Sequence, residues 1–304
     1  MGVRTQVRIR LPACYHSRQQ SKQQEHELLS KAPIHSECSG HETPRLLFVH
    51  GWCGDSTQWR YQREHFEPSH QVVTCDLRGH GASKEFEVGF DVPTGGADVA
   101  RLLTDSEVSP TVVAGHGMGC RMVLEAVQLA PDAVVGVVLV NGNRNIAGDP
   151  DQAVRDVRDR YAATGFDHLR ETLLDAMFHQ DSDSVHKAEI IERARRVPES
   201  VAEAYWCNIL RWDAAHMEIA LKSLKVPLLI LQSTYLTSEY KYLGVEPRMV
   251  TPWFEVIGRL VPTVRIQIIG GVGHFPMLDA AEALNRCITT FLADATFRRF
   301  FESR

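Results

Sequence analysis

The chain lacks any long hydrophobic run and any strong excess of charge. No stretch approaches the roughly 20 apolar residues of a membrane-spanning helix, and the N-terminus has no signal-peptide hydrophobic segment. With 33 Lys and Arg against 38 Asp and Glu, the formal net charge is −5. This balance gives no electrostatic reason to expect binding to nucleic acid or to an anionic membrane. We therefore expect neither as a partner.

Cysteine pairs with the spacing of a metal or redox site are also missing. The seven cysteines are an odd number, widely spaced, and none stands in a Cys-x-x-Cys or Cys/His ligand pattern. The simplest interpretation is a reduced, cytoplasmic protein with no metal site and no organic cofactor.

What is present is a regular alternation of apolar strands and amphipathic helices. Short continuous apolar runs indicate strands buried on both faces, so the fold class is α/β with a mostly parallel, doubly wound sheet. The expected strands cover residues 45–49, 71–75, 111–114, 134–140, 226–232 and 263–269. In such sheets, ligands bind at the carboxyl ends of the strands.

The alternation is interrupted by a charged, mostly helical segment over residues 145–220. Since the chain returns to the sheet at Val226, we interpret this segment as a helical cap inserted into a core formed by residues 45–144 and 221–304. A separate domain is the alternative. Residues 1–44 read as N-terminal strand and polar linker; the basic first 24 residues also resemble a transit peptide weakly, but their alternation favours a strand.

A reactive serine is missing where the pattern calls for one. Gly115-His116-Gly117-Met118-Gly119 follows an apolar strand and opens an amphipathic helix, which is the layout of a G-x-S-x-G nucleophile elbow. Gly117 occupies the serine position and has no side chain. Chemistry at this elbow cannot pass through a serine acyl-enzyme.

A base is present, but a carboxylate to orient it is not. His274 lies in Gly270-Gly271-Val272-Gly273-His274, between the last strand and the last helix. The strand tip at which an orienting acid is expected carries Asn141, which can hold an imidazole by a hydrogen bond but cannot stabilise its charged form. Glu239 is a possible alternative acid, and Asp279 is more typical of a helix cap.

Donors for an oxyanion are predicted in two turns. The backbone N–H of Trp52, after the first long strand, and that of Met118, after the elbow position, are the candidates. His50 and His116 stand beside these turns, and we expect them to line the substrate site too.

Together, His50-Gly51-Trp52, Asp76 to Ser83, the elbow and Gly273-His274-Phe275 resemble the α/β-hydrolase superfamily over roughly residues 40–295. The Gly51-Trp52-Cys53 stretch and the C-terminal histidine motif are also similar to the cofactor-independent dioxygenases of the 3-hydroxy-4-oxoquinoline type. In that branch, the resemblance implies an acid at position 141 and a histidine that deprotonates the substrate.

Three functional hypotheses remain open. The first is a hydrolase of a small apolar ester or lactone, in which His274 activates a water. The second is a non-hydrolytic lyase, isomerase or cofactor-free oxygenase, and the third is an inactive ligand-binding relative. Cap aromatics favour an apolar small-molecule substrate, although for any one of them packing onto the sheet is the stronger explanation; these are Phe166, Phe178, Tyr205, Trp206 and Trp212. The sequence does not decide the oligomeric state.

Overall fold

The computed structural model describes residues 33–104, 110–144, 148–237 and 241–303. The chain divides into two units, residues 1–33 and residues 34–304, and the account below concerns the second. The strand predicted within the first 24 residues lies outside the described part. Among the described helices, none is both long and apolar enough to cross a membrane.

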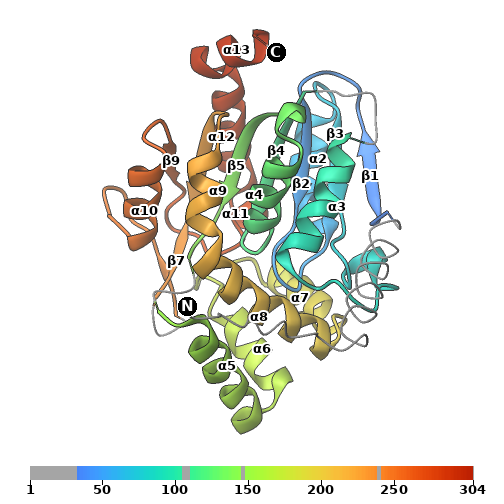
Figure 1. Cartoon of the computed structure of the whole chain (residues 1–304), viewed down its shortest axis with the longest axis vertical. Coiled ribbons are helices and arrows are strands. Elements are labelled where there is room, and N and C mark those ends of the chain that lie inside the picture. Colours follow the sequence, from blue (N-terminus) through green and yellow to red (C-terminus); the bar gives the residue numbers. More distant parts are fainter. Residues whose placement is uncertain (1–32, 105–109, 145–147, 238–240, 304) are drawn as a thin grey trace, which may run out of the picture. The chain divides into compact units, whose positions relative to one another are not determined.

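A seven-stranded sheet forms the centre of the second unit, in the order β1-β3-β2-β4-β5-β6-β9 (Figure 1). β1 pairs antiparallel with β3, and the other neighbours pair in parallel. The strands are β1 (Ser36–Ser39), β2 (Arg45–Val49), β3 (Val72–Cys75), β4 (Thr111–His116), β5 (Val134–Val140), β6 (Leu228–Gln232) and β9 (Arg265–Ile268).

The central strands are buried along their whole length. Every residue of β5, with the sequence VVGVVLV, is buried, and so is every residue of β2. Continuous runs of branched apolar side chains form such strands because both faces are covered by helices. The predicted α/β fold with a mostly parallel sheet is therefore confirmed.

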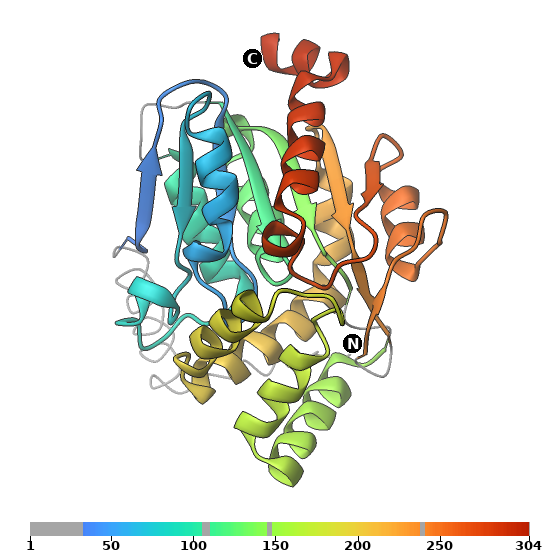
Figure 2. The ribbon, with the colours of Figure 1, turned by 180° about the vertical axis from the view of Figure 1, so that it is seen from behind.

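Helices cover both faces of this sheet (Figure 1 and Figure 2). One face carries α3 (Val92–Thr104), α4 (Gly119–Leu129) and α9 (Met217–Ser223). The opposite face carries α2 (Arg60–Phe66) and α12 (Ala281–Ala293), which follows the short α11 (Pro276–Asp279). α10 (Pro252–Leu260) lies near the β9 edge, and α13 (Ala295–Glu302) ends the described chain.

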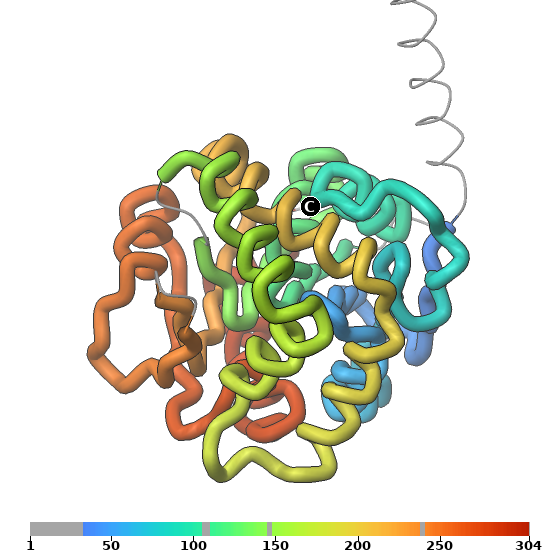
Figure 3. Tube along the Cα trace, turned by 90° about the horizontal axis from the view of Figure 1, so that it is seen from below, coloured from blue at the N-terminus to red at the C-terminus, as the bar shows by residue number. Residues whose placement is uncertain are grey.

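Four further helices lie between β5 and β6 in the sequence and cross the carboxyl end of the sheet (Figure 3). They are α5 (Pro150–Thr164), α6 (Phe166–Asp175), α7 (Ser184–Arg195) and α8 (Glu199–Ala215). α8 is attached to the core by hydrogen bonds: the Trp52 indole N–H donates to the Ala202 carbonyl, and the Tyr205 hydroxyl donates to the Arg78 carbonyl. These helices therefore form a roof over the edge where ligands of such sheets bind.

The strand order reverses around β2, which has β3 on one side and β4 on the other. In open parallel sheets a crevice forms at the carboxyl ends of strands where this reversal occurs. The turn after β2 and the turn after β4 meet there. A two-stranded ribbon, β7 (Thr234–Leu236) with β8 (Tyr242–Gly244), closes the crevice on the β6 side.

Candidate active site

The turn between β4 and α4 has the geometry of a nucleophile elbow. Gly117 adopts a φ of 51°, in the left-handed region. A Cβ at Gly119 would lie 2.5 Å from the His50 carbonyl oxygen, and a Cβ at Gly115 would lie 2.6 Å from the Gly119 oxygen. The two outer glycines are thus required because strand and helix approach too closely for any side chain.

Gly117 differs from these two glycines because its surroundings are much less crowded. A Cβ built on it would meet only one heavy atom within 4 Å, the Nε2 of His274, at 3.3 Å. The middle position of the elbow therefore points at the histidine that the sequence singles out.

His274 is held by the loop that follows β9. Its backbone N–H donates to the Met177 carbonyl, and its Nδ1 lies 2.9 Å from the Thr234 hydroxyl. The Tyr242 ring packs 4.6 Å from the imidazole, centroid to centroid. Burial, and then the neighbouring His116 and Arg121, lower the pKa of His274 well below its ordinary value. The imidazole is therefore neutral at pH 7 and can accept a proton.

Asn141 does not contact this imidazole, although it was the first candidate for its partner. Its Nδ2 donates to the Ser233 hydroxyl (2.7 Å) and to the His274 carbonyl (2.9 Å), and its Oδ1 accepts from the backbone N–H groups of Ser233 and Thr234. With a φ of 48° and no exposed surface, Asn141 fixes the backbone that presents Thr234 and His274. The partner of the imidazole is the Thr234 hydroxyl.

The second candidate acid, Glu239, lies outside the described residues. No carboxylate is found among the described residues that line the chamber beside His274, a cavity of about 40 Å³. These residues are Trp52, His116, Gly117, Met118, Arg121, Asn143, Met177, Trp206, Ile209, Tyr242, His274 and Phe275. A volume of this size accommodates about one water molecule or the end of a ligand.

Both predicted oxyanion donors border this chamber. Trp52 and Met118 line it, and neither backbone N–H has a hydrogen-bond acceptor among the described residues. The Trp52 indole N–H is used by Ala202, and its ring meets Trp206 edge-on at 4.9 Å. Two unpaired amides beside a neutral histidine are the donors that a developing oxyanion requires.

The two other histidines of the prediction are occupied by structural hydrogen bonds. His116 donates from Nε2 to the His274 carbonyl, and its Nδ1 accepts from the Gln58 amide. His50 accepts the Leu77 N–H at Nε2 and faces the Gly51 carbonyl with Nδ1. Burial lowers the pKa of His116 to about 4 and also lowers that of His50, so both rings are neutral. His116 lines the chamber, whereas His50 supports the turn beneath it.

Arg121 is a chamber residue that the sequence did not single out. Its guanidinium donates twice to the Asp213 carboxylate, at 2.9 and 2.6 Å, and also to the carbonyls of Gly117 and Asn143. Both members of this pair are at most 1% exposed. A buried charge is tolerated only when it is paired and hydrogen-bonded, so Arg121 joins the elbow to α8 structurally.

No cluster of three or more His, Cys, Asp or Glu side chains suited to a metal ion occurs within the described ranges. The six cysteines of these ranges are free thiols. Burial raises the pKa of Cys120, the cysteine beneath the elbow, to about 12, which leaves it an unreactive thiol. The groups able to act on a ligand in the chamber are therefore His274, Tyr242 and the two amides.

This elbow, crevice and histidine loop define an α/β hydrolase. The model of the alpha/beta hydrolase family matches residues 46–286, and the chain belongs to this family. It is 26% identical over 267 residues to the bifunctional esterase/perhydrolase DCH of Acinetobacter calcoaceticus, covering 83% of this chain and 92% of that protein.

Two further comparisons show the breadth of the family. Over 130 residues, the chain is 31% identical to 2-succinyl-6-hydroxy-2,4-cyclohexadiene-1-carboxylate synthase of Salmonella newport, a match that spans 41% of this chain and about half (49%) of the synthase. The enol-lactonase of Burkholderia xenovorans superposes with a TM-score of 0.68 at 20% identity, covering 86% of this chain and 96% of that one. At this identity the structural likeness shows the fold alone.

Proposed function

We propose that this protein hydrolyses a small apolar ester or lactone without a covalent acyl-enzyme. His274 is the base, and the nucleophile is a water held where a serine side chain stands in related enzymes. The observation that carries the proposal is the place of Gly117 in the chamber wall: its missing Cβ would lie 3.3 Å from His274 Nε2 and would meet no other heavy atom within 4 Å. The chamber of about 40 Å³ has room for that water.

The steps follow from the groups around the chamber. Nε2 of the neutral His274 takes a proton from the water as its oxygen adds to the acyl carbon, and the carbonyl oxygen becomes an oxyanion facing the N–H groups of Trp52 and Met118. The same proton then passes to the leaving alkoxide as the tetrahedral intermediate collapses. The Thr234 hydroxyl orients the ring but carries no charge, so it stabilises the imidazolium less than a carboxylate does.

This arrangement sets the expected rate. Replacing the orienting carboxylate by a neutral group costs on the order of 10⁴ in rate in a serine protease. We therefore expect slow turnover. The family supports the reaction class, because a relative that matches most of the chain is an esterase and perhydrolase.

The test is hydrolysis of a panel of p-nitrophenyl esters and aryl lactones by the purified protein. His274→Ala is expected to abolish the activity, and His41→Ala, at an exposed histidine, is expected to leave it unchanged. Hydrolysis in ¹⁸O-water should place one solvent oxygen in the acid, and a fluorophosphonate probe should not label the wild type. Absence of hydrolysis, or full activity in His274→Ala, contradicts the proposal.

A second candidate uses the same groups without water. A neutral histidine facing two free amides is suited to removing a proton next to a carbonyl and to stabilising the enolate, and one partial relative is a synthase. Product formation without solvent oxygen, or oxygen uptake, identifies this reaction. Ligand binding without turnover in either assay would instead indicate a binding protein.

A further inference from the structure

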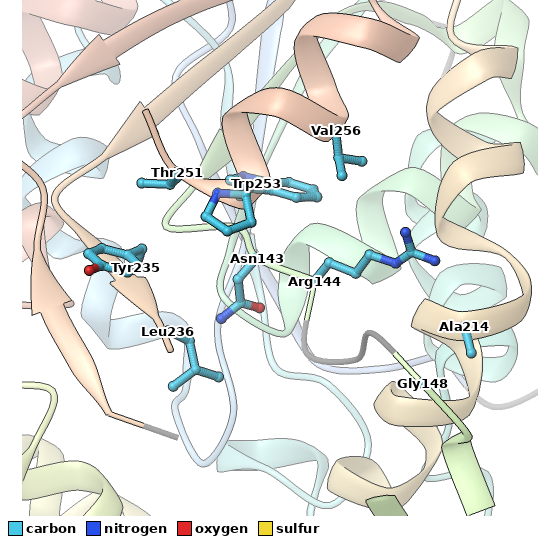
Figure 4. A pocket seen from close by; sticks show the side chains of 10 residues that line it. Asn143, Arg144, Gly148, Ala214, Tyr235, Leu236, Thr251, Trp253 and Val256 are labelled. Atoms are coloured by element: carbon cyan, nitrogen blue, oxygen red, sulfur yellow. The ribbon is translucent and has the colours of Figure 1, made fainter. Parts of the chain in front are cut away.

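A second and larger cavity lies next to the His274 chamber. It has a volume of about 430 Å³, within the usual range of small-molecule sites. Residues at the start of α10, at the end of β7 and in the segment after β5 line it (Figure 4). Asn143 lines both cavities, so a ligand that fills the larger one lies against the wall of the His274 chamber.

The larger cavity is positively charged. Among the described residues that line it, Arg144 is the only one with a charge. Arg144 pairs with Glu218 at 3.0 Å, but the same carboxylate also faces Arg259 at 3.4 Å and Lys222 at 3.6 Å. Three cations thus share one carboxylate, and among the described residues the positive charge beside the cavity exceeds the negative charge paired with it.

Hydrogen-bond donors without acceptors gather here as well. The Arg144 Nε is buried and has no acceptor among the described residues, and the same is true of the Trp253 indole N–H. Trp253 is only 5% exposed, so bulk water does not satisfy its N–H. A buried donor without an acceptor destabilises the protein, and a ligand oxygen at this place would supply the missing hydrogen bond.

The wall between the cavities offers a further donor. Nη2 of Arg121 donates to both the backbone oxygen and the Oδ1 of Asn143, each at 2.8 Å. This pair of contacts fixes the orientation of the amide, so its Nδ2 is a donor without a described acceptor. Thr251, which also lines the cavity, caps α10 by accepting from the Phe254 N–H, and the positive end of that helix adjoins the site.

We propose that this cavity binds the carboxylate of a small apolar substrate whose reacting carbonyl lies beside His274. Arg144 and the Trp253 N–H bind the carboxylate oxygens. Leu236, Pro252 and Val256 contact the hydrocarbon part of the molecule. The position of the reacting end rests on the proposed function; the carboxylate site does not.

Binding without turnover tests the site. The probes are 3-phenylpropionate and its primary amide, which differ in charge but hardly in shape, titrated by calorimetry at low salt. The wild type is expected to bind the acid about tenfold more tightly than the amide, because hydrogen bonds to a charged group are the stronger ones. Equal affinity for the two, or no detectable binding of the acid, overturns the proposal.

Three variants locate the effect. Arg144→Gln should remove the preference for the acid, and Trp253→Phe should weaken acid binding about threefold or more. Arg259→Gln is the matched control, since Arg259 contacts the same Glu218 without lining the cavity, and it should keep the preference. A preference that survives both Arg144→Gln and Trp253→Phe, or that is lost equally in Arg259→Gln, refutes the assignment.

His274→Ala separates this inference from the proposed function. The variant should bind 3-phenylpropionate as the wild type does while hydrolysing nothing. Acid-selective binding in a protein that hydrolyses no ester would leave this site standing and reject the hydrolase. Ester hydrolysis without acid selectivity would do the reverse.

Discussion

Replacing Asn141 with Asp puts an acid at the strand tip where the sequence pattern predicts one, yet the structure predicts that this change damages the fold. The Asn141 Nδ2 donates to the His274 carbonyl at 2.9 Å and to the Ser233 hydroxyl at 2.7 Å. In Asn141→Asp, a carboxylate oxygen would face that carbonyl oxygen, which has only lone pairs to offer. The charge would also be fully buried, since Asn141 has no exposed surface.

The size of the effect follows from these contacts. An uncompensated buried charge costs about 3–5 kcal/mol, which corresponds to raising the carboxyl pKa by roughly 2–4 units above its usual value near 4. Since the folded state then holds a proton that the unfolded state releases, the free energy of unfolding of Asn141→Asp falls as pH rises from about 4 to the raised pKa. Below that range the protonated acid can donate to the His274 carbonyl, and the loss is small.

Urea unfolding at about pH 5 and about pH 8 measures this difference. Asn141→Ala is the control, because it adds no titratable group; it removes the hydrogen bonds of both Nδ2 and Oδ1, and the two orphaned amides of Ser233 and Thr234 cost about 2–6 kcal/mol. Its stability should therefore follow the pH dependence of the wild type. An Asn141→Asp variant as stable as the wild type at about pH 8 would refute the structural role given to Asn141.

Three further predictions concern protonation and charge. The kcat/KM for any reaction in which His274 is the base should be constant between about pH 6 and pH 8, because the pKa of His274 is lowered. The decrease of kcat/KM at acid pH should therefore lie well below pH 6.5, and an inflection near pH 6.5 contradicts this. The free energy of unfolding should decrease as pH falls below about 6.5, since His50 and His116 stay neutral in the folded state and take up protons on unfolding. Urea titrations that show no such decrease would contradict this prediction. Arg121→Met should destabilise by about 3–5 kcal/mol because it removes the cation that pairs with the buried Asp213 carboxylate, and adding Asp213→Leu should recover part of that loss in the same measurement.

The fold was predictable because its strands are continuous apolar runs. β2 and β5 have the predicted bounds, and β4 extends two residues further, to His116. Elements with weaker apolar signals were not predicted. α2 buries only Gln62 and Phe66 in a polar stretch, and the β7–β8 ribbon consists of two three-residue strands held by the neighbouring loops.

The geometry of the candidate site followed from the sequence where glycine and histidine mark a turn, and less so where a partner is neutral; the catalytic roles stay predictions. The sequence singled out His274 and Gly117, and the structure places the two against each other. Thr234 was not predicted, because the group that orients a catalytic histidine is expected to be a carboxylate or a carboxamide such as that of Asn141, and a hydroxyl at a strand end carries no comparable signal. Arg121 and Asp213 are 92 residues apart, and their pairing arises only when α8 packs on α4.

The attachment of α8 also decides how the roof can open. Moving α8 away from the sheet would break the Arg121–Asp213 ion pair, whose side chains are at most 1% exposed. It would also break the hydrogen bonds of the Trp52 indole and the Tyr205 hydroxyl. α5 is joined to α8 by ion pairs that lie at the surface, Arg158–Glu203 and Arg211–Asp151. Surface ion pairs contribute little, whereas a buried pair is costly to break, so displacing α5 from the roof costs less free energy than displacing α8.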